Sequence, residues 1–417
     1  MNKIPPLIQE QSSAEQVPLA EQLERLNFIV NQTPALIGYW DNYLINQFSN
    51  AAYSRWFGQS PEEIKGKHLR EILGDALYKS LSSEIDGVMH GKEQRYERHF
   101  TDANTGEKIH TLTRYVPDID KGQVKGFCVL GVDITEVKQL ELLAYDALQR
   151  GLDADEFELY YQPQANMRTG KVLGFEALIR WNKNQSELEE PARFLPLIQN
   201  TVLGVELGWW VMKSALAQLA QWHAQGLDTT LSINVDARQL QLPQFVIKLE
   251  AELNTFSHFK PGSLIIEILE TTPIDDRAKV TEVINHCRAL GVEFDLDDFG
   301  TGYSSIAYLR ELPIKTLKID RSFITDITHS DYNQKLVVNI IRLANDIDKQ
   351  VIAEGVETIE QGELLIKLGC EVGQGYAIAK PMPVDKVLPW LREWQPDTAW
   401  QSSTLCRLAS TKSLSLS

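Results

Sequence analysis

The second half of the chain alternates short apolar runs with longer stretches in which apolar residues recur every three or four positions. The short runs cover residues 174–178, 231–234, 264–267, 294–298, 316–320 and 351–354. The helical spacing is clearest at Leu336, Ile340, Leu343 and Ile347. Such alternation predicts parallel strands joined by helices, which over about 250 residues close into a (β/α)8 barrel of the α/β class.

Polar side chains stand at or near the ends of these runs. They are Glu176, Asn234, Glu267, Asp297, Asp298, Lys318 and Glu354. A parallel barrel builds its active site from several strand ends at one face, and acids are rarely buried unless they are paired or liganded. Oxygen donors without His or Cys favour hard cations such as Mg²⁺, Mn²⁺ or Ca²⁺. Each acid alone would be an ordinary solvated loop residue, but together they predict a metal site.

The adjacent pair Asp297 and Asp298 sharpens this prediction. Neighbouring residues of a strand point to opposite faces, so both carboxylates reach one site only where the strand ends and the backbone turns, as Gly300 and Gly302 permit. Two carboxylates at such a corner can hold two metals about 3.5–4 Å apart, an arrangement used for phosphodiester hydrolysis. The alternative for Asp298 is a capping residue beside a turn.

Lys318 lies inside the apolar run of residues 316–320. If its side chain points into the barrel beside the carboxylates, it keeps its charge and orients an attacking water or stabilises a phosphoryl oxygen. The alternative is a lysine whose stem follows the surface and whose ammonium lies in solvent.

Residues 21–134 have a mixed pattern that predicts a small antiparallel sheet with helices. We expect a helix over 21–31, an extended run over 36–40 and helical turns over 51–57. A hairpin is expected with strands over 110–116 and 124–132 and a turn over 117–123. The sequences of segments 38–41, 50–53, 122–127 and 133–136 resemble those of PAS sensor domains. The resemblance implies an α+β sensor domain.

A helical pattern continues over residues 135–150, with Val137, Leu140, Ala144 and Ala147 at spacings of three and four. This spacing suits either the seam of a two-stranded coiled coil or one face of a single connector helix. We therefore expect five segments: a loose lead over 1–20, the sensor domain over 21–134, the connector helix over 135–150, the barrel over 151–400 and a flexible tail over 401–417.

Composition narrows the possible partners and the compartment. The 417 residues carry a net charge of −16, which argues against a nucleic acid polymer or an anionic membrane as partner. The four cysteines have no paired spacing, so we expect free thiols in a reducing compartment. Neither a signal sequence nor an uninterrupted apolar stretch of about 18 residues is present. The expectation is a soluble, cytoplasmic protein.

The motifs around the strand ends resemble, over nearly all of residues 151–395, those of the EAL family of cyclic di-GMP phosphodiesterases. The signature Glu-Ala-Leu-Ile-Arg-Trp spans 176–181, and further family motifs stand at 161–163, 233–235, 267–270, 297–305, 318–320, 353–358 and 374–376. The resemblance implies a barrel with one antiparallel strand. It also implies hydrolysis of cyclic di-GMP to linear pGpG, with Mg²⁺ or Mn²⁺ as cofactor.

The resemblance further implies a role for each site residue. One metal would be held by Glu176, Asn234, Glu267 and Asp297. The second would be held by Asp297 and Asp298, with Glu354 nearby. The catalytic group would be Glu176, Lys318 and Glu354, with Lys318 assisting the attacking water.

Five more residues receive roles by motif position. Arg180 would contact a substrate phosphate and Gln162 a guanine. Glu357 and Gln374 would complete the water and metal shell at the substrate. Glu270 would anchor the loop over 298–305, which in this family links metal binding to dimer contacts.

Two questions remain open at the level of sequence. A catalytically silent cyclic di-GMP receptor is the alternative to an enzyme, since a barrel fold can be kept after its catalytic activity is lost. The motifs of this chain retain all of their acids and their lysine.

The ligand of the sensor domain is unknown. Its histidines, His68, His90, His99 and His110, are each conceivable haem ligands, but isolated histidines are more often ordinary surface or core residues. We expect the sensor to modulate activity and the chain to form a homodimer.

Overall fold

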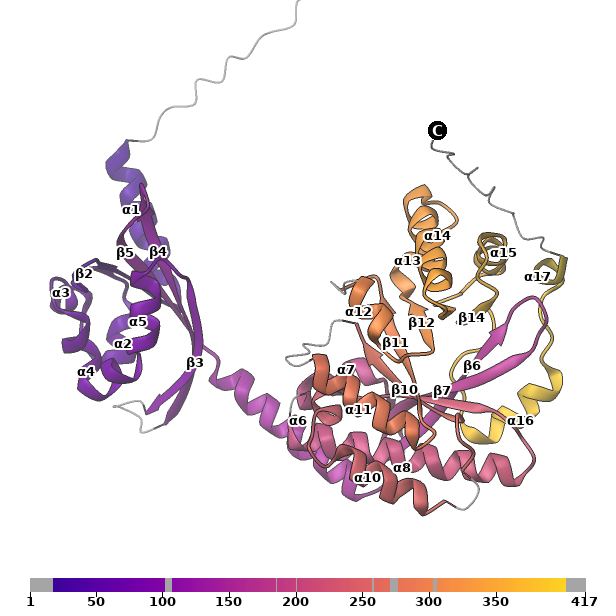
Figure 1. The fold of residues 1–417 in the computed structure, drawn as a ribbon. Helices are drawn as coiled ribbons and strands as arrows, with labels where there is room; N and C mark the ends of the chain where they lie inside the picture. The colour runs from indigo at the N-terminus through magenta and orange to yellow at the C-terminus, as the bar shows by residue number, and fades with distance from the viewer. Residues whose placement is uncertain are drawn as a thin grey trace, which may run out of the picture. The chain divides into compact units, whose positions relative to one another are not determined.

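The computed structural model describes residues 18–101, 107–184, 186–199, 201–256, 259–270, 277–302 and 306–402. The chain divides into two compact units, Met1–Ala144 and Tyr145–Ser417 (Figure 1). We refer to them as the N-terminal unit and the barrel unit. The predictions of a loose lead and a flexible tail fall mainly on residues 1–17 and 403–417, which lie outside the described residues.

The N-terminal unit is built on a five-stranded antiparallel sheet in the order β2-β1-β5-β4-β3. The strands are β1 (Leu36–Asp41), β2 (Asn46–Ser49), β3 (Gln94–Thr101), β4 (Lys108–Asp120) and β5 (Gln123–Asp133). One face of the sheet is covered by α2 (Ala52–Phe57), α3 (Pro61–Ile64), α4 (Leu69–Ser80) and α5 (Ser82–Met89) (Figure 1). In the middle of β4, the alternate residues Thr111, Thr113 and Tyr115 are buried there because strand side chains alternate between faces. This confirms the predicted α+β architecture.

The predicted hairpin exists, but the turn expected over 117–123 is wrong. Strand β4 continues to Asp120 and β5 begins at Gln123, so only Lys121 and Gly122 form the turn, with φ of 50° and 82°. Positive φ at both positions is what a type I′ hairpin requires. Pro117 suggested a loop, yet it pairs with Phe127 inside β4. On its other edge β4 pairs with β3 only as far as Tyr115, so the missing N–H of Pro117 breaks no hydrogen bond with β3.

Two helices flank the sheet along the chain. The helix α1 (Leu19–Gln32) confirms the prediction over 21–31 and buries none of its side chains. The helix predicted over 135–150 is α6 (Thr135–Asp153). Val137 and Leu140 are exposed on α6, whereas Leu148 is buried against the barrel unit. The pairing of α6 with a second copy stays a prediction.

The barrel unit closes through eight strands, which confirms the predicted fold. They are β6 (Phe157–Asn166), β7 (Val172–Lys183), β9 (Thr230–Asn234), β10 (Leu264–Leu269), β11 (Glu293–Phe299), β12 (Thr316–Ile319), β13 (Gln350–Glu354) and β14 (Val372–Gln374). Strand β6 pairs antiparallel with both β7 and β14, and the other barrel pairings are parallel. The short β8 (Glu187–Glu189) extends β7 outside the ring. The beginning of β6 therefore lies at the same barrel end as the carboxyl ends of the parallel strands.

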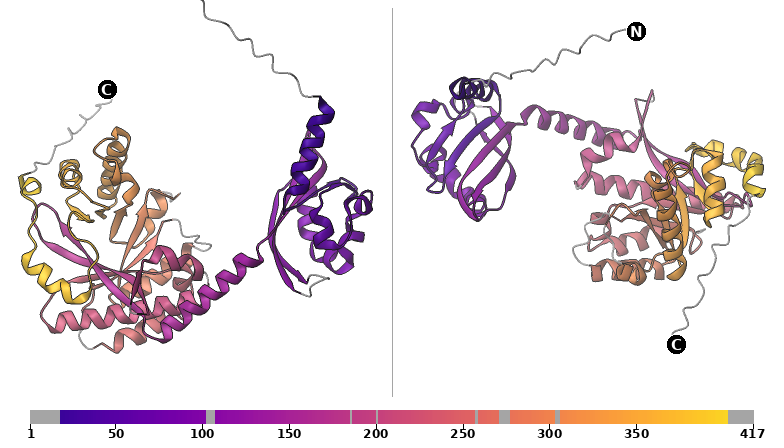
Figure 2. Two further views of the ribbon diagram at one scale, coloured as in Figure 1. Left: turned by 180° about the vertical axis from the view of Figure 1, so that it is seen from behind. Right: turned by 90° about the horizontal axis from the view of Figure 1, so that it is seen from above.

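Helices surround this barrel (Figures 1 and 2). They are α7 (Pro191–Ile198), α8 (Val202–Ala224), α9 (Ala237–Leu240), α10 (Phe245–Asn254), α11 (Arg277–Ala289), α12 (Ile306–Glu311), α13 (Arg321–Thr325), α14 (Asp331–Asp346), α15 (Ile359–Leu368), α16 (Val384–Glu393) and α17 (Thr398–Ser402). The helix α15 ends at Gly369, whose φ of 101° suits a left-handed cap. Within the described ranges, no helix has both the length and the apolar character needed to cross a membrane.

Candidate active site

Lys318 lies at the centre of a buried ring of carboxylates. It stands in β12, and its side chain is 0% exposed. Its Nζ lies 2.6 Å from Glu354 Oε1, 2.8 Å from Glu267 Oε2, 3.0 Å from Asp297 Oδ1 and 3.5 Å from Glu176 Oε2. The alternative of a lysine that reaches solvent is therefore wrong, and the prediction of a lysine inside the barrel is confirmed.

Glu176, Asn234 and Glu267 come together from three neighbouring strands. Strand register places Asn234 of β9 directly beside Glu267 of β10. The Asn234 Nδ2 donates to Glu176 Oε1 at 2.8 Å. Parallel pairing in register lines up residues that are far apart in sequence, because inward-pointing side chains of adjacent strands form layers in a barrel.

Asp297 and Asp298 both face the site through a local irregularity of β11. One oxygen from each of Asp297, Asp298 and Glu354 lies within 4.8 Å of the others. We expected the strand to end at this pair, but β11 continues to Phe299. Instead, the pairing with β12 shifts register between Leu296 and Phe299, and Asp298 has a φ of 53°. A bulge of this kind re-aims side chains and lets consecutive carboxylates share one face.

The electrostatics of the ring reflect an excess of negative charge. Burial alone would lower the pKa of Lys318, but the surrounding carboxylates raise it well above its ordinary value. Burial raises the pKa of Glu267 well above its usual range, and it raises that of Glu354 to about 8. Burial and the neighbouring Asp297 raise the pKa of Asp298 to about 6. One ammonium does not neutralise five carboxylates, so the site favours further positive charge.

The donor set fits a hard divalent cation. Among the described residues, Glu267 Oε1 and Asp297 Oδ1 are buried without a hydrogen-bond donor. The 3.0 Å separation of Asp297 Oδ1 from Lys318 Nζ is an ion-pair distance that lacks hydrogen-bond geometry. Buried carboxylate oxygens are costly unless something compensates them. Oxygen-only donors are the ligands that Mg²⁺ and Mn²⁺ prefer.

Three glutamines form a hydrogen-bonded chain beside Glu176. Gln374 Nε2 donates to Glu176 Oε2 at 2.5 Å and to Gln162 Oε1 at 3.0 Å. Gln164 Nε2 donates in turn to Gln374 Oε1 at 3.0 Å. Gln162 also donates to the Ala379 carbonyl. This chain of donors fixes the carboxylate of Glu176 and places Gln162 and Gln374 beside the ring. Their predicted contacts with substrate stay predictions.

Two predicted residues stand apart from the ring. Arg180 lies four residues farther along β7 than Glu176 and is 8% exposed. It donates to the Ile179 carbonyl, and its guanidinium lies 5.6 Å from the centre of the Tyr160 ring. Glu357 is exposed after β13, and its backbone N–H donates to Gln361 Oε1. The predicted contact of Arg180 with a substrate phosphate stays a prediction.

Glu270 holds the backbone that follows Asp298. Its Oε2 accepts from the N–H groups of Gly300 at 2.7 Å and Gly302 at 3.0 Å. Its own N–H donates to the Asp297 carbonyl at 3.0 Å. The side chain therefore ties the end of β10 to the bulge that carries both aspartates. The rest of the predicted loop, residues 303–305, lies outside the described residues.

Sequence reasoning missed Gln164 and Asp295. Gln164 follows Gln162 by two positions in β6, and Asp295 precedes Asp297 by two in β11, so each shares a face with a predicted residue. Asp295 is 1% exposed, and burial raises its pKa. The period of two was the available signal, and strand register pairs Asp295 directly with Glu267 of the ring.

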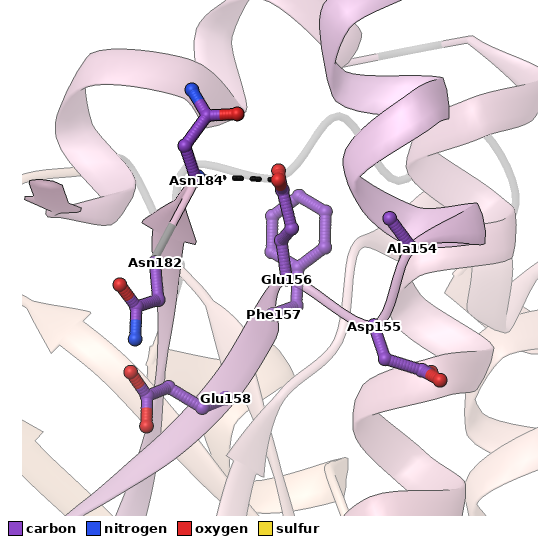
Figure 3. Close-up of a pocket in the computed structure, with 7 residues that line it drawn as sticks. All are labelled: Ala154, Asp155, Glu156, Phe157, Glu158, Asn182 and Asn184. Carbon is purple, nitrogen blue, oxygen red and sulfur yellow. Dashed lines mark hydrogen bonds between the residues drawn. The ribbon is translucent and has the colours of Figure 1, made fainter. Parts of the chain in front are cut away.

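A separate hollow of about 620 Å³ lies at the rim of the same barrel end, beside the start of β6. Figure 3 shows Glu158 and Asn182 pointing toward one another across one side of it. Its Glu156 accepts from the Asn184 N–H at 3.1 Å and from Trp181 Nε1 at 2.9 Å. These bonds fix the end of β7, and no residue of the carboxylate ring lines this hollow.

Comparison with known proteins shows which families the two units match. Residues 145–381 match the EAL domain, and residues 30–139 match the PAS fold. The EAL match covers more than half of the chain. The chain belongs to the EAL domain family. The N-terminal unit is accordingly its PAS domain, and the carboxylate ring lies in its EAL domain.

Several relatives of this EAL protein carry functional names. Cyclic di-GMP phosphodiesterase PA2567 of Pseudomonas aeruginosa is 37% identical over 80% of this chain and 54% of the relative. Cyclic di-GMP phosphodiesterase PdeR of Escherichia coli is 34% identical over 64% of this chain and 40% of the relative. The solved c-di-GMP complex of PaMucR phosphodiesterase aligns with a TM-score of 0.56 and 36% identity, covering 59% of this chain and 99% of that one. The chain spans about half the length or less of these curated relatives.

Proposed function

We propose that this EAL protein hydrolyses cyclic di-GMP to linear pGpG. The observation that carries the proposal is the buried ring of carboxylates around Lys318. In this ring Glu267 and Asp297 keep oxygens that no donor of the described part of the chain reaches. The names of the relatives support the substrate, and the oxygen-only donors support Mg²⁺ or Mn²⁺.

The positions of the residues in the ring suggest which metal each would hold. Glu176, Asn234, Glu267 and Asp297 would hold one metal, whereas Asp297 and Asp298 would hold a second, with Glu354 beside it. Two such cations, when bound, supply an activated water and neutralise charge on the phosphodiester. Water adds to phosphorus, one ester P–O bond breaks, and the leaving oxygen takes a proton.

The protein's own groups prepare that attack. Lys318 keeps a fixed positive charge in a dry environment, where it orients the attacking water and stabilises developing negative charge. Gln374 holds the Glu176 carboxylate in place through its 2.5 Å hydrogen bond. Arg180, near the rim, would bind the second phosphate, and Gln162 would contact a guanine. Glu357 would complete the shell on the substrate side, and Glu270 would keep the aspartate bulge in position.

The assay follows pGpG by chromatography after the full chain is incubated with cyclic di-GMP and Mg²⁺ or Mn²⁺. Glu176→Gln should abolish product formation, because one of the carboxylates proposed to hold a metal is lost. Glu250→Gln, at an exposed position of α10, is the matched control and should retain the parent rate. Binding of cyclic di-GMP by the parent chain without any turnover would contradict the proposal and identify a receptor.

We further propose that the PAS domain modulates this activity and that the chain acts as a cytoplasmic homodimer. Val137 and Leu140, exposed on α6 between the two domains, support a dimer seam. The free, buried thiols of Cys287 and Cys370 suit a reducing compartment. Sedimentation of the parent and of Leu140→Glu tests the dimer, and an unchanged mass for the variant would contradict the α6 seam.

A further inference from the structure

Two histidines face each other across the outer side of the PAS sheet. His99 of β3 pairs directly with His110 of β4. Their ring centroids lie 5.8 Å apart, and the ring planes are inclined by 42°. His110 alternates along β4 with the buried Thr111 and Thr113, so it points to the face that α2 to α5 do not cover, and His99 opposite it shares that face. His99 is exposed and His110 is half-buried.

The backbone of His110 shows which kind of cross-strand pair this is. The His110 N–H donates to Thr135 Oγ1 at 2.8 Å, and the His110 carbonyl accepts from the Ile134 N–H at 2.8 Å. Both backbone groups of His110 therefore point away from β3. His99 and His110 form a non-hydrogen-bonded pair, the type of antiparallel pair in which side chains approach most closely.

We propose that His99 and His110 chelate one borderline transition-metal cation of the Cu²⁺, Ni²⁺ or Zn²⁺ class. Metal–imidazole bonds of about 2 Å allow the centroids of two bound rings to lie up to about 6.4 Å apart, and the observed 5.8 Å is within that limit. Cations of this class bind imidazole nitrogen well, whereas hard cations prefer oxygen donors.

Both rings are available as ligands. Among the described residues, no hydrogen bond engages a ring nitrogen of His99 or His110. Glu97, two residues from His99 on the same strand, is engaged by Lys138 Nζ at 2.9 Å. The two imidazoles thus provide the protein ligands, and water completes the coordination.

The site lies where the PAS sheet passes into α6. Thr135, which accepts from the His110 N–H, is the first residue of that helix, and Ile134, which donates to the His110 carbonyl, directly precedes it. Lys138, one turn into α6, is bound to Glu97 of β3. A cation that fixes the two rings therefore stiffens the strand pair to which the start of α6 is hydrogen-bonded.

The test titrates Cu²⁺ into the full chain in the presence of excess Mg²⁺, which fills sites made of oxygen donors. Electron paramagnetic resonance should show one Cu²⁺ per chain with couplings from two imidazole nitrogens. His99→Asn and His110→Asn should each remove one nitrogen and weaken binding by on the order of a hundredfold, because the chelate loses one arm.

His90→Asn is the matched control, since His90 is exposed on the same domain and lies beside Asp86. It should keep the parent spectrum. Unchanged spectra and affinities in both His99→Asn and His110→Asn would overturn the proposal, as would a parent spectrum without paired nitrogens. The inference is independent of the proposed hydrolase activity, because the barrel site offers no imidazole and the copper result stands whether or not pGpG forms.

Discussion

In the PAS domain, the inner face of the sheet carries Tyr115, Phe127 and Val129, packed against helices. In the EAL domain, the inner face of the barrel carries Lys318 and Glu267 at comparable burial, 0% and 1% exposed. The same alternation of side chains thus produces an apolar core in one domain and a charged core in the other.

The two interiors tolerate change in different ways. An apolar core is stabilised by contact area, so a truncation costs the lost contacts plus the cavity. A charged core is stabilised only when every group has a partner, so removing one partner leaves the others buried and uncompensated. The charged interior lowers the stability of the fold, but it brings the candidate catalytic groups together at one place.

Replacement of Lys318, whose ammonium lies at the centre of the ring, should have the largest effect. Lys318→Met should lower turnover on the order of a thousandfold. It should also destabilise the metal-free EAL domain by about 3–5 kcal/mol, because four carboxylates lose their shared partner. Urea unfolding measures the second effect. Lys367→Met, which breaks an exposed pair with Glu363, is the control and should cost less than about 1 kcal/mol. Equal costs for the two variants would contradict the charged-core interpretation.

Truncation of the apolar core should be nearly as costly, but only within its own domain. Phe127→Ala should destabilise the PAS domain by about 3–5 kcal/mol through lost contacts and a cavity. Phe175→Ala in the barrel is the mirror variant, since Phe175 is equally buried. Hydrogen exchange measured by mass spectrometry reports each domain separately. Loss of protection across both domains in either variant would show that they do not fold as separate units.

Loss of the loop anchor should have an intermediate effect. Glu270→Ala removes the acceptor for the Gly300 and Gly302 N–H groups and frees the bulge that aims Asp298. Turnover should fall by on the order of tenfold to a hundredfold, because small displacements of reacting groups are costly. The Mg²⁺ dependence of kcat should shift as well. Glu252→Ala, on α10, is the control, and a variant of Glu270 with unchanged kcat would remove its assigned role.

A surface hydrogen bond of the PAS domain should have the smallest effect. Tyr39 donates to Asp118 Oδ2 at 2.6 Å, and partial burial together with this bond raises the pKa of Tyr39 to about 12. The neutral phenol is the stabilised form, so its contribution is complete below pH 10 and is lost as pH rises toward 12. Tyr39→Phe should cost about 0.5–1 kcal/mol at neutral pH and abolish this alkaline dependence. Ultraviolet titration of the phenolate measures the pKa directly.

The sequence determined the elements and the chemistry of the barrel mouth. Apolar runs of period two and helices of period 3.6 are local properties, so the strands carrying Glu176, Asn234 and Glu267 were predictable with the polar residues at their ends. Gln164 and Asp295 were available from the same period of two but were overlooked. In the PAS domain, Pro117 and neighbouring polar residues hid the true length of β4, because whether a proline interrupts a strand depends on the neighbouring strand.

Tertiary structure decided what depends on pairing between distant segments. Closure of the barrel pairs β14 with β6 and so brings Gln374 beside Gln162 and Glu176. A shifted register with β12, together with the positive φ of Asp298, turns two consecutive aspartates toward one site. Only the closed barrel decides that Lys318 meets carboxylates from four other strands, because burial of a charge is settled by the groups that surround it rather than by its place in a run.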